Sequence, residues 1–143
     1  MKIVIDNNIA LDALLGRKPF NETAERILTA CADTHMGCLS VNSLTDIFYV
    51  LRKSMDVPYA KAAVKKLMDL LEIISVSDED CLNALSLPID DFEDALVVVC
   101  GKNAKADCIV TRDETFLKIS SPIPVMSPDR LLELLENSKS RSV

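Results

Sequence analysis

The sequence predicts an α/β protein, a three-layer α/β/α sandwich in which a central, mostly parallel sheet of four to five strands lies between two layers of helices. Short β-branched runs alternate with longer segments of helical periodicity along the chain. No internal repeat or low-complexity segment interrupts this alternation. The 143 residues, 49% of them hydrophobic, suffice for one core. We therefore expect a single domain over residues 1–136 and a polar tail over residues 137–143.

The elements of the N-terminal part follow from local composition. Residues 2–5 are mostly apolar and β-branched, so they predict a buried strand. A helix is expected over residues 7–15, because apolar residues recur there on one side and Gly16 follows. Asn21 can cap a second helix, and residues 36–41 predict a second strand.

The middle of the chain continues the alternation. A helix is expected to begin at residues 42–43, because the apolar residues that follow have helical spacing. Pro58 fits the first turn of the next helix, where its missing N–H would have no helical partner. Residues 73–76 predict the third strand, and a capped helix is expected over residues 77–85.

The C-terminal part adds the remaining elements. Pro88 separates the preceding helix from one expected over residues 91–104. Residues 108–111 and 124–126 predict the fourth strand and a short final one. A last helix is expected over residues 128–136, because proline at its start favours helix initiation.

Composition excludes several classes of function. The five cysteines lack a Cys-x-x-Cys pair, and His35 is the single histidine, so zinc binding and histidine-based catalysis are disfavoured. The net charge of −6 argues against a simple DNA-binding module, but it is compatible with a metal-dependent nuclease. No apolar stretch approaches the roughly 20 residues that span a bilayer, and we expect a cytoplasmic protein without a membrane partner.

Four carboxylates stand at the ends of apolar runs or within segments expected to be buried: Asp6, Asp46, Asp94 and Asp113. Burial normally excludes charge, so acids in such places need an explanation. Asp6 and Asp113 follow predicted parallel strands, at the sheet edge where ligands of α/β proteins bind. If the fold gathers the four side chains, they form an oxygen-ligand site suited to Mg²⁺ or Mn²⁺.

Each acid also has a local explanation. Asp6 can cap the first helix, and Asp113 can form a turn after its strand. Asp46 follows Ser43 at the spacing of a capping box. The acids within residues 90–94 suit the start of a helix, although capping does not account for all of them. Taken singly, the residues leave capping and metal binding both open.

Taken in order, these residues resemble the PIN-domain family of metal-dependent nucleases, in particular VapC-like toxin ribonucleases and their single-domain relatives. The resemblance covers nearly the whole chain. The matching segments are Asp6-Asn7-Asn8 after the first strand, Asp46 in Ser43-Leu44-Thr45-Asp46-Ile47, Asp94-Ala95, and Thr111-Arg112-Asp113 with Phe116 close behind. The chain departs from the family at Asp46, where the usual residue is the longer Glu.

The resemblance implies hydrolysis of RNA phosphodiester bonds by water that Mg²⁺ or Mn²⁺ activates. It gives Asp6 and Asp94 the main metal-ligand roles and makes Asp46 and Asp113 direct or water-mediated ligands. Residues expected to position acids or water are Asn8, Asp91 and Thr111. Cations that could steer RNA phosphates are Arg17, Lys18, Arg52, Lys53, Lys102 and Arg112. A homodimer is implied, as is an antitoxin protein lying over the active-site groove.

Two other readings remain. A catalytically weak PIN-like module that binds RNA or protein would share the fold with a poorer metal site. A phosphoryl-transfer domain of receiver or haloacid-dehalogenase type also places an acid after its first strand. The haloacid-dehalogenase pattern requires a second Asp where this chain has Asn8, so the sequence fits that class poorly.

Overall fold

A computed structural model describes residues 1–141 of the chain and contains one five-stranded sheet. All pairings are parallel, and the strand order is β3-β2-β1-β4-β5. The strands are β1 (Lys2–Ile5), β2 (Met36–Ser40), β3 (Glu72–Ile74), β4 (Cys108–Val110) and β5 (Val125–Met126). The predicted α/β/α sandwich with a parallel sheet is therefore confirmed, with all five strands present.

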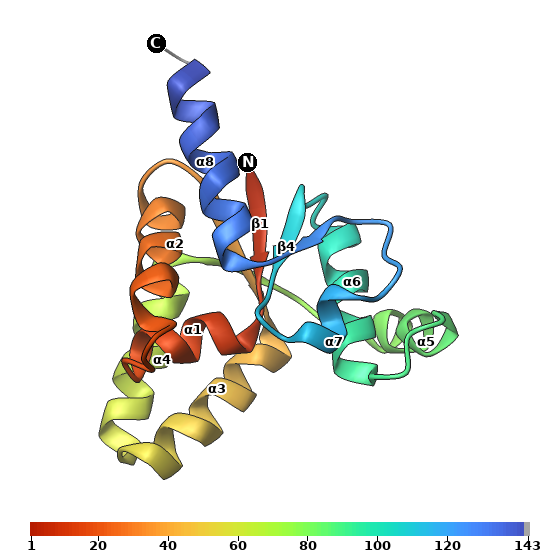
Figure 1. The fold of residues 1–143 in the computed structure, drawn as a ribbon. Coiled ribbons are helices and arrows are strands. Elements are labelled where there is room, and N and C mark those ends of the chain that lie inside the picture. The colour runs from red at the N-terminus through yellow and green to blue at the C-terminus, as the bar shows by residue number, and fades with distance from the viewer. Residues whose placement is uncertain (142–143) are drawn as a thin grey trace.

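Eight helices connect and cover the described strands. They are α1 (Asn7–Leu14), α2 (Asn21–Asp33), α3 (Val41–Ser54), α4 (Val57–Leu70), α5 (Asp78–Ser86), α6 (Phe92–Asn103), α7 (Glu114–Leu117) and α8 (Pro128–Arg141). Figure 1 shows α1 to α4 and α8 on one side of the sheet, and α5, α6 and α7 on the other.

The alternation of side chains along β1 builds both halves of the core. Ile3 and Ile5 pack with residues of α1 to α4 and α8, whereas Val4 packs with residues of α5, α6 and α7. Helix α6 is buried at every position from Ala95 to Gly101, which explains its uninterrupted apolar sequence. Because β1 is covered on both faces, its residues are all apolar after Lys2.

Most expected elements agree with the observed ones to within a few residues, and the differences have local causes. Helix α3 begins at Val41, with Ser40 in the capping position, rather than at residues 42–43. The short α7 was not expected. Helix α8 continues past Glu136 to Arg141, so residues 137–141 of the predicted tail are helical. Residues 142–143 lie outside the described residues.

The sheet order places a topological switch between β1 and β4. The chain passes from β1 to β2 and β3 on one side of the sheet, and then crosses to β4 and β5 on the other side. Ligands of such sheets bind in the crevice at the carboxyl ends of the strands at this point. Within the described residues, no helix is long and apolar enough to cross a membrane.

Candidate active site

Asp6 lies directly after β1, at the switch point. Its backbone N–H donates to the carbonyl of Val110 at the end of β4, at 3.0 Å. One carboxylate oxygen, Oδ1, accepts the N–H of Asn7 at 2.9 Å, so Asp6 caps α1. The other, Oδ2, accepts the hydroxyl of Thr111 at 2.7 Å and the side-chain amide of Asn8 at 3.1 Å. The capping role expected from the sequence and a place in the site therefore coexist.

Thr111 and Asn8 connect Asp6 to the loop after β4. The Asn8 amide also donates to Thr111 Oγ1 at 3.1 Å, and Asn8 Oδ1 accepts the backbone N–H of Arg112 at 3.2 Å. Thr111 Oγ1 in turn accepts the backbone N–H of Asp113 at 3.1 Å. Because Thr111 is buried, this network fixes the separation of the two strand ends. The structure thus brings Asn8 and Thr111 to the places from which they can orient Asp6.

Asp113 caps the short helix α7, because its Oδ1 accepts the N–H of Thr115 at 2.9 Å. Its charge acts on Asp6, whose pKa is raised above 3.8 by burial first, while the Thr111 hydrogen bond opposes the rise. Two acids that are distant in the sequence are therefore neighbours at this sheet edge.

Asp94 lies in the first turn of α6, where its backbone N–H donates to Oδ1 of the capping residue Asp91 at 3.0 Å. Burial raises the pKa of Asp94 from 3.8 to about 7, and repulsion from Asp91, Asp6, Asp113 and Glu93 adds to the rise. A small cleft of about 170 Å³ is lined by Asp91 and Asp94 together with Thr115. Asp94 is therefore the carboxylate on which all these neighbouring acids act electrostatically.

Asp46 lies on α3 beyond its first turn, so the expected capping box with Ser43 is wrong. The shift arises because Ser40 ends β2 and occupies the capping position itself. Asp46 Oδ2 accepts the side-chain amide of Asn7 at 3.3 Å. This contact places Asp46 beside the polar triplet that follows β1, on the side of the sheet edge away from β4.

Glu93 is a site residue that sequence reasoning did not select. Burial raises its pKa, and a hydrogen bond and charge repulsion from Asp46 raise it further. The link joins the start of α6 to α3. In the sequence, Glu93 stands in the first turn of a helix, where an acid is ordinary. Its position next to Asp94 was therefore the only sequence signal that it belongs to the site.

Asp6, Asp46, Asp94 and Asp113 lie at one edge of the sheet, which we call the acidic edge, but their carboxylates do not converge. Among the described residues, no three His, Cys, Asp or Glu side chains converge closely enough to hold a metal ion as they stand. A larger hollow of about 580 Å³ lies between α2 and α8, but none of the predicted site residues lines it. The acidic edge therefore remains the candidate site. To bind a cation there, the carboxylates would have to move closer together.

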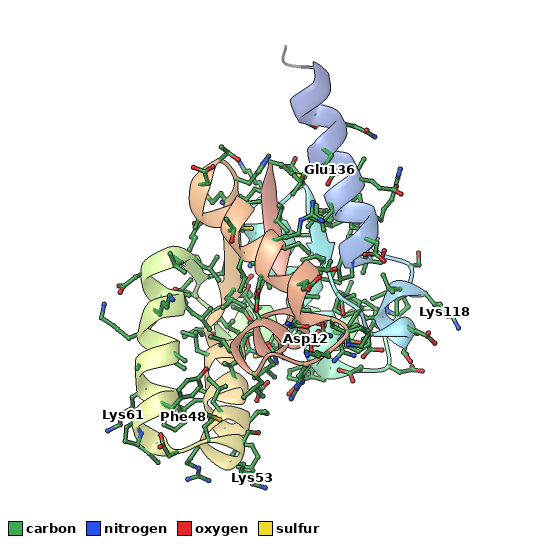
Figure 2. All side chains as sticks on the ribbon, turned by 60° about the vertical axis from the view of Figure 1, so that its left-hand side comes forward. Asp12, Phe48, Lys53, Lys61, Lys118 and Glu136 are labelled. Carbon is green, nitrogen blue, oxygen red and sulfur yellow. The ribbon has the colours of Figure 1, made fainter. Side chains whose placement is uncertain are left out.

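Two of the six cations expected to steer RNA phosphates are engaged elsewhere. Arg112 forms a two-point ion pair with Asp12, through Nε at 2.6 Å and a terminal nitrogen at 2.9 Å. Its guanidinium also stacks over the ring of Phe20, 4.1 Å from the centroid. Arg17 approaches the same buried Asp12 at 3.8 Å. Asp12 lies inside the molecule (Figure 2), and no local pattern marked it as special.

Comparison with known proteins assigns this fold and sequence to a family. Residues 2–115 match the family model described as the PIN domain. The chain belongs to the PIN-domain family. Ribonuclease VapC1 of Aquifex aeolicus (strain VF5) is 25% identical to it over 138 residues, which cover 92% of this PIN-domain chain and 94% of that protein.

Solved structures of toxins share the PIN-domain fold. VapC20 of Mycobacterium tuberculosis, described as a toxin that cleaves the sarcin-ricin loop, has a TM-score of 0.68 at 15% identity. The match covers 80% of this chain and 92% of that one. A toxin–antitoxin complex from Klebsiella pneumoniae has a TM-score of 0.67 at 18% identity, covering 88% of this chain and 97% of that one. Identities this low carry the fold alone.

Proposed function

We propose that this PIN-domain protein is a divalent-metal-dependent ribonuclease that hydrolyses RNA phosphodiester bonds. One observation carries the proposal: Asp94 lies among other carboxylates at the switch point of the sheet, and its pKa is raised to about 7. Such a concentration of negative charge is costly without a cation, and a divalent ion would relieve it. The likeness to a VapC ribonuclease supports RNA as the substrate.

The chemistry of the side chains present suits Mg²⁺ or Mn²⁺, although their carboxylates would have to move closer together to hold the ion. The donors are carboxylate oxygens, which these hard ions prefer, and the buried Asn7 Oδ1 has no hydrogen-bond partner at the same edge. Asp6, Asp94 and Asp113 would hold the ion, with Asp46 acting directly or through water. When bound, the ion supplies positive charge that lowers the pKa of water and offsets charge developing on the phosphate.

The remaining residues of the site position these ligands. Asn8 and Thr111 hold the Asp6 carboxylate by hydrogen bonds of 3.1 and 2.7 Å. Asp91 fixes the first turn of α6 and thereby the direction from which Asp94 approaches. Neither of these tasks requires a histidine, which agrees with the near absence of histidine in the chain.

We further propose a toxin role, with an antitoxin protein as a partner and a homodimer as the working form. The proposal rests on likeness: the Klebsiella pneumoniae neighbour is a toxin–antitoxin complex, and VapC20 is described as a toxin. A second candidate function is a catalytically weak RNA- or protein-binding module. The replacement of the usual Glu by Asp46, and its hydrogen bond to Glu93, favour that alternative.

Cleavage of a mixed RNA pool tests the nuclease proposal. With Mn²⁺ or Mg²⁺ present, we expect the protein to cut the pool and Asp94→Asn to lower the rate by about 100-fold or more, because a ligand carboxylate is lost. Asp78→Asn serves as the matched control, since Asp78 is exposed in the first turn of α5. Equal cleavage by the protein and by Asp94→Asn would mean that a contaminant or a different site is responsible.

A further inference from the structure

Helix α3 carries a row of polar side chains that begins at the acidic edge and runs away from the sheet. Asn42, Asp46, Tyr49 and Lys53 follow one another at intervals of four, three and four residues. Residues spaced in this way lie on one side of a helix. The opposite flank packs into the core through Leu44, Ile47 and Leu51. Asp46 faces the candidate site. Tyr49 and Lys53 lie on the same side of α3, progressively closer to its C-terminal end.

The far part of this row joins an aromatic ring to two cations. Tyr49 is 50% exposed, so part of its ring is open to a ligand. Lys53 Nζ lies 4.6 Å and Arg52 Cζ 5.6 Å from the centroid of its ring. Figure 2 shows Lys53 at the end of α3 that is remote from the sheet. We call Tyr49, Arg52 and Lys53 the α3 cluster.

The α3 cluster matches the chemistry of unpaired RNA. A base that is not paired presents a flat face that stacks on an aromatic ring, and cations beside the ring attract the flanking phosphates. The net charge of the chain is −6, so an RNA strand needs such a local positive patch near the acidic edge. A rise of 1.5 Å per residue puts Tyr49 about 5 Å and Lys53 about 10 Å along the axis from Asp46.

We propose that the α3 cluster binds an unpaired nucleotide next to the phosphate held at the acidic edge. The inference rests on the proposed ribonuclease function and adds the residues that hold the neighbouring nucleotide. Tyr49 stacks on the base, while Lys53 and Arg52 contact the phosphates. Arg17 and Arg112, which pair with Asp12, contribute less to phosphate binding than these two.

Binding is tested separately from cleavage, in a protein that carries Asp94→Asn and is measured with Mg²⁺. The probe is a single-stranded RNA oligonucleotide that carries a fluorescent label, and the signal is the fluorescence anisotropy of that label. Adding Tyr49→Ala should raise Kd roughly 5- to 150-fold, the loss of one stacked base. Tyr49→Phe, which keeps the ring, should leave Kd within about twofold by fluorescence anisotropy of labelled RNA.

The salt dependence of RNA binding provides a second, independent test, which concerns the cations of the α3 cluster. Lys53→Gln should reduce the slope of log Kd against log salt by about 0.7, the loss of one phosphate contact. Lys61→Gln is the matched control, since Lys61 projects from α4, away from Lys53 on α3 (Figure 2). Met68→Ala controls for Tyr49→Ala, because Met68 is also 50% exposed and lies on α4.

The outcomes separate the two proposals. If Tyr49→Ala weakens RNA binding but the parent protein cuts no RNA, the ribonuclease proposal fails and the RNA-binding inference stands. If Tyr49→Ala and Tyr49→Phe bind RNA equally, or if fully paired RNA binds as tightly as single-stranded RNA, the inference is overturned. It is also overturned if Tyr49→Ala halves the mass seen by light scattering without changing Kd, since the cluster would then join two copies of the chain.

Discussion

At the scale of single residues, the central feature is the proton affinity of Asp94. Its pKa of about 7 has burial as the largest cause and four neighbouring acids as the others. Burial and repulsion from Asp46, Asp91 and Asp6 raise the pKa of Glu93, and Asp113 contributes to the rise at Asp6. At neutral pH a metal-free protein therefore carries a proton on part of its Asp94 side chains, and this proton would compete with the proposed ion for the same oxygens.

The raised pKa of Asp94 predicts a pH-dependent effect of Asp94→Asn on stability. Below pH 4 both folded and unfolded Asp94 are protonated, so the residue costs nothing. Between about pH 4 and 7 the unfolded form loses its proton first, and the folded state loses stability as pH rises. In EDTA, Asp94→Asn should therefore be more stable than the parent at pH 8 and nearly equal to it at pH 4, by urea unfolding. A stability difference that is the same at both pH values would contradict the repulsion at this site, and Asp78→Asn is the control.

At the scale of elements, three acids of the site begin three helices. Asp6 caps α1, Asp91 caps α6 and Asp113 caps α7, so the starts of these helices surround the acidic edge. Backbone N–H groups at helix starts favour negative charge. Capping and metal binding, which the sequence leaves as alternatives, are therefore compatible here, because the caps would hold the carboxylates in place for the proposed ion.

A second element-scale feature is the ion pair between α1 and the loop after β4. Arg112 binds Asp12 at two points, and the Asp12 side chain is only 1% exposed. This pair holds the segment between Thr111 and Asp113 against α1. The ring of Phe20 covers one side of the Arg112 guanidinium, so the loop before α2 also contacts this ion pair.

Arg112→Ala should destabilise the fold by about 3 kcal/mol, because it leaves the buried Asp12 without its main partner. Arg112→Lys should recover only part of this loss, since an ammonium cannot make the two-point contact. Urea denaturation measures both. Arg26→Ala is the control: its pair with Glu136 is exposed at both ends, and its loss should cost less than about 1 kcal/mol. Equal losses for Arg112→Ala and Arg26→Ala would show that Asp12 is satisfied without Arg112.

The sequence predicts much of this architecture because its strands are short β-branched runs. It also predicts the position of Asp6 and Asp113, because both directly follow or closely follow such runs and parallel strands end at one edge. It does not predict the partner of Arg112, which lies 100 residues away, or the burial of Asp12 within an ordinary helical pattern. Glu93 was missed because a helix start explains an acid locally, whereas its contact with Asp46 depends on the packing of α6 near α3.

At the scale of the whole molecule, the acidic edge is the joint product of both helical layers. Asp46 comes from a helix on one face of the sheet, and Asp94 comes from a helix on the other. Asp6 and Asp113 lie between them at the strand ends. An ion bound at this edge would therefore connect both layers through the sheet, and its effect should extend to the stability of the entire fold.

Metal binding should accordingly raise the melting temperature. At an Mn²⁺ concentration 100 times its dissociation constant, the gain is about 2.7 kcal/mol, or roughly 8 °C for a domain of this size. Differential scanning calorimetry with and without EDTA measures it, and Asp94→Asn should show little of the gain. If Mn²⁺ neither shifts the melting temperature nor gives heat of binding, the weak-module alternative replaces the nuclease proposal.

The pairing of β1 with β4 also has a consequence for the order of events during synthesis. Asp6 emerges from the ribosome well before its partner Thr111 and its neighbour Asp113. A nascent chain that stops before β4 has neither the strand that aligns Asp6 nor the loop that brings Asp113 to it. A nuclease built in this way would stay harmless toward its own messenger RNA until β4 and the loop after it had been translated.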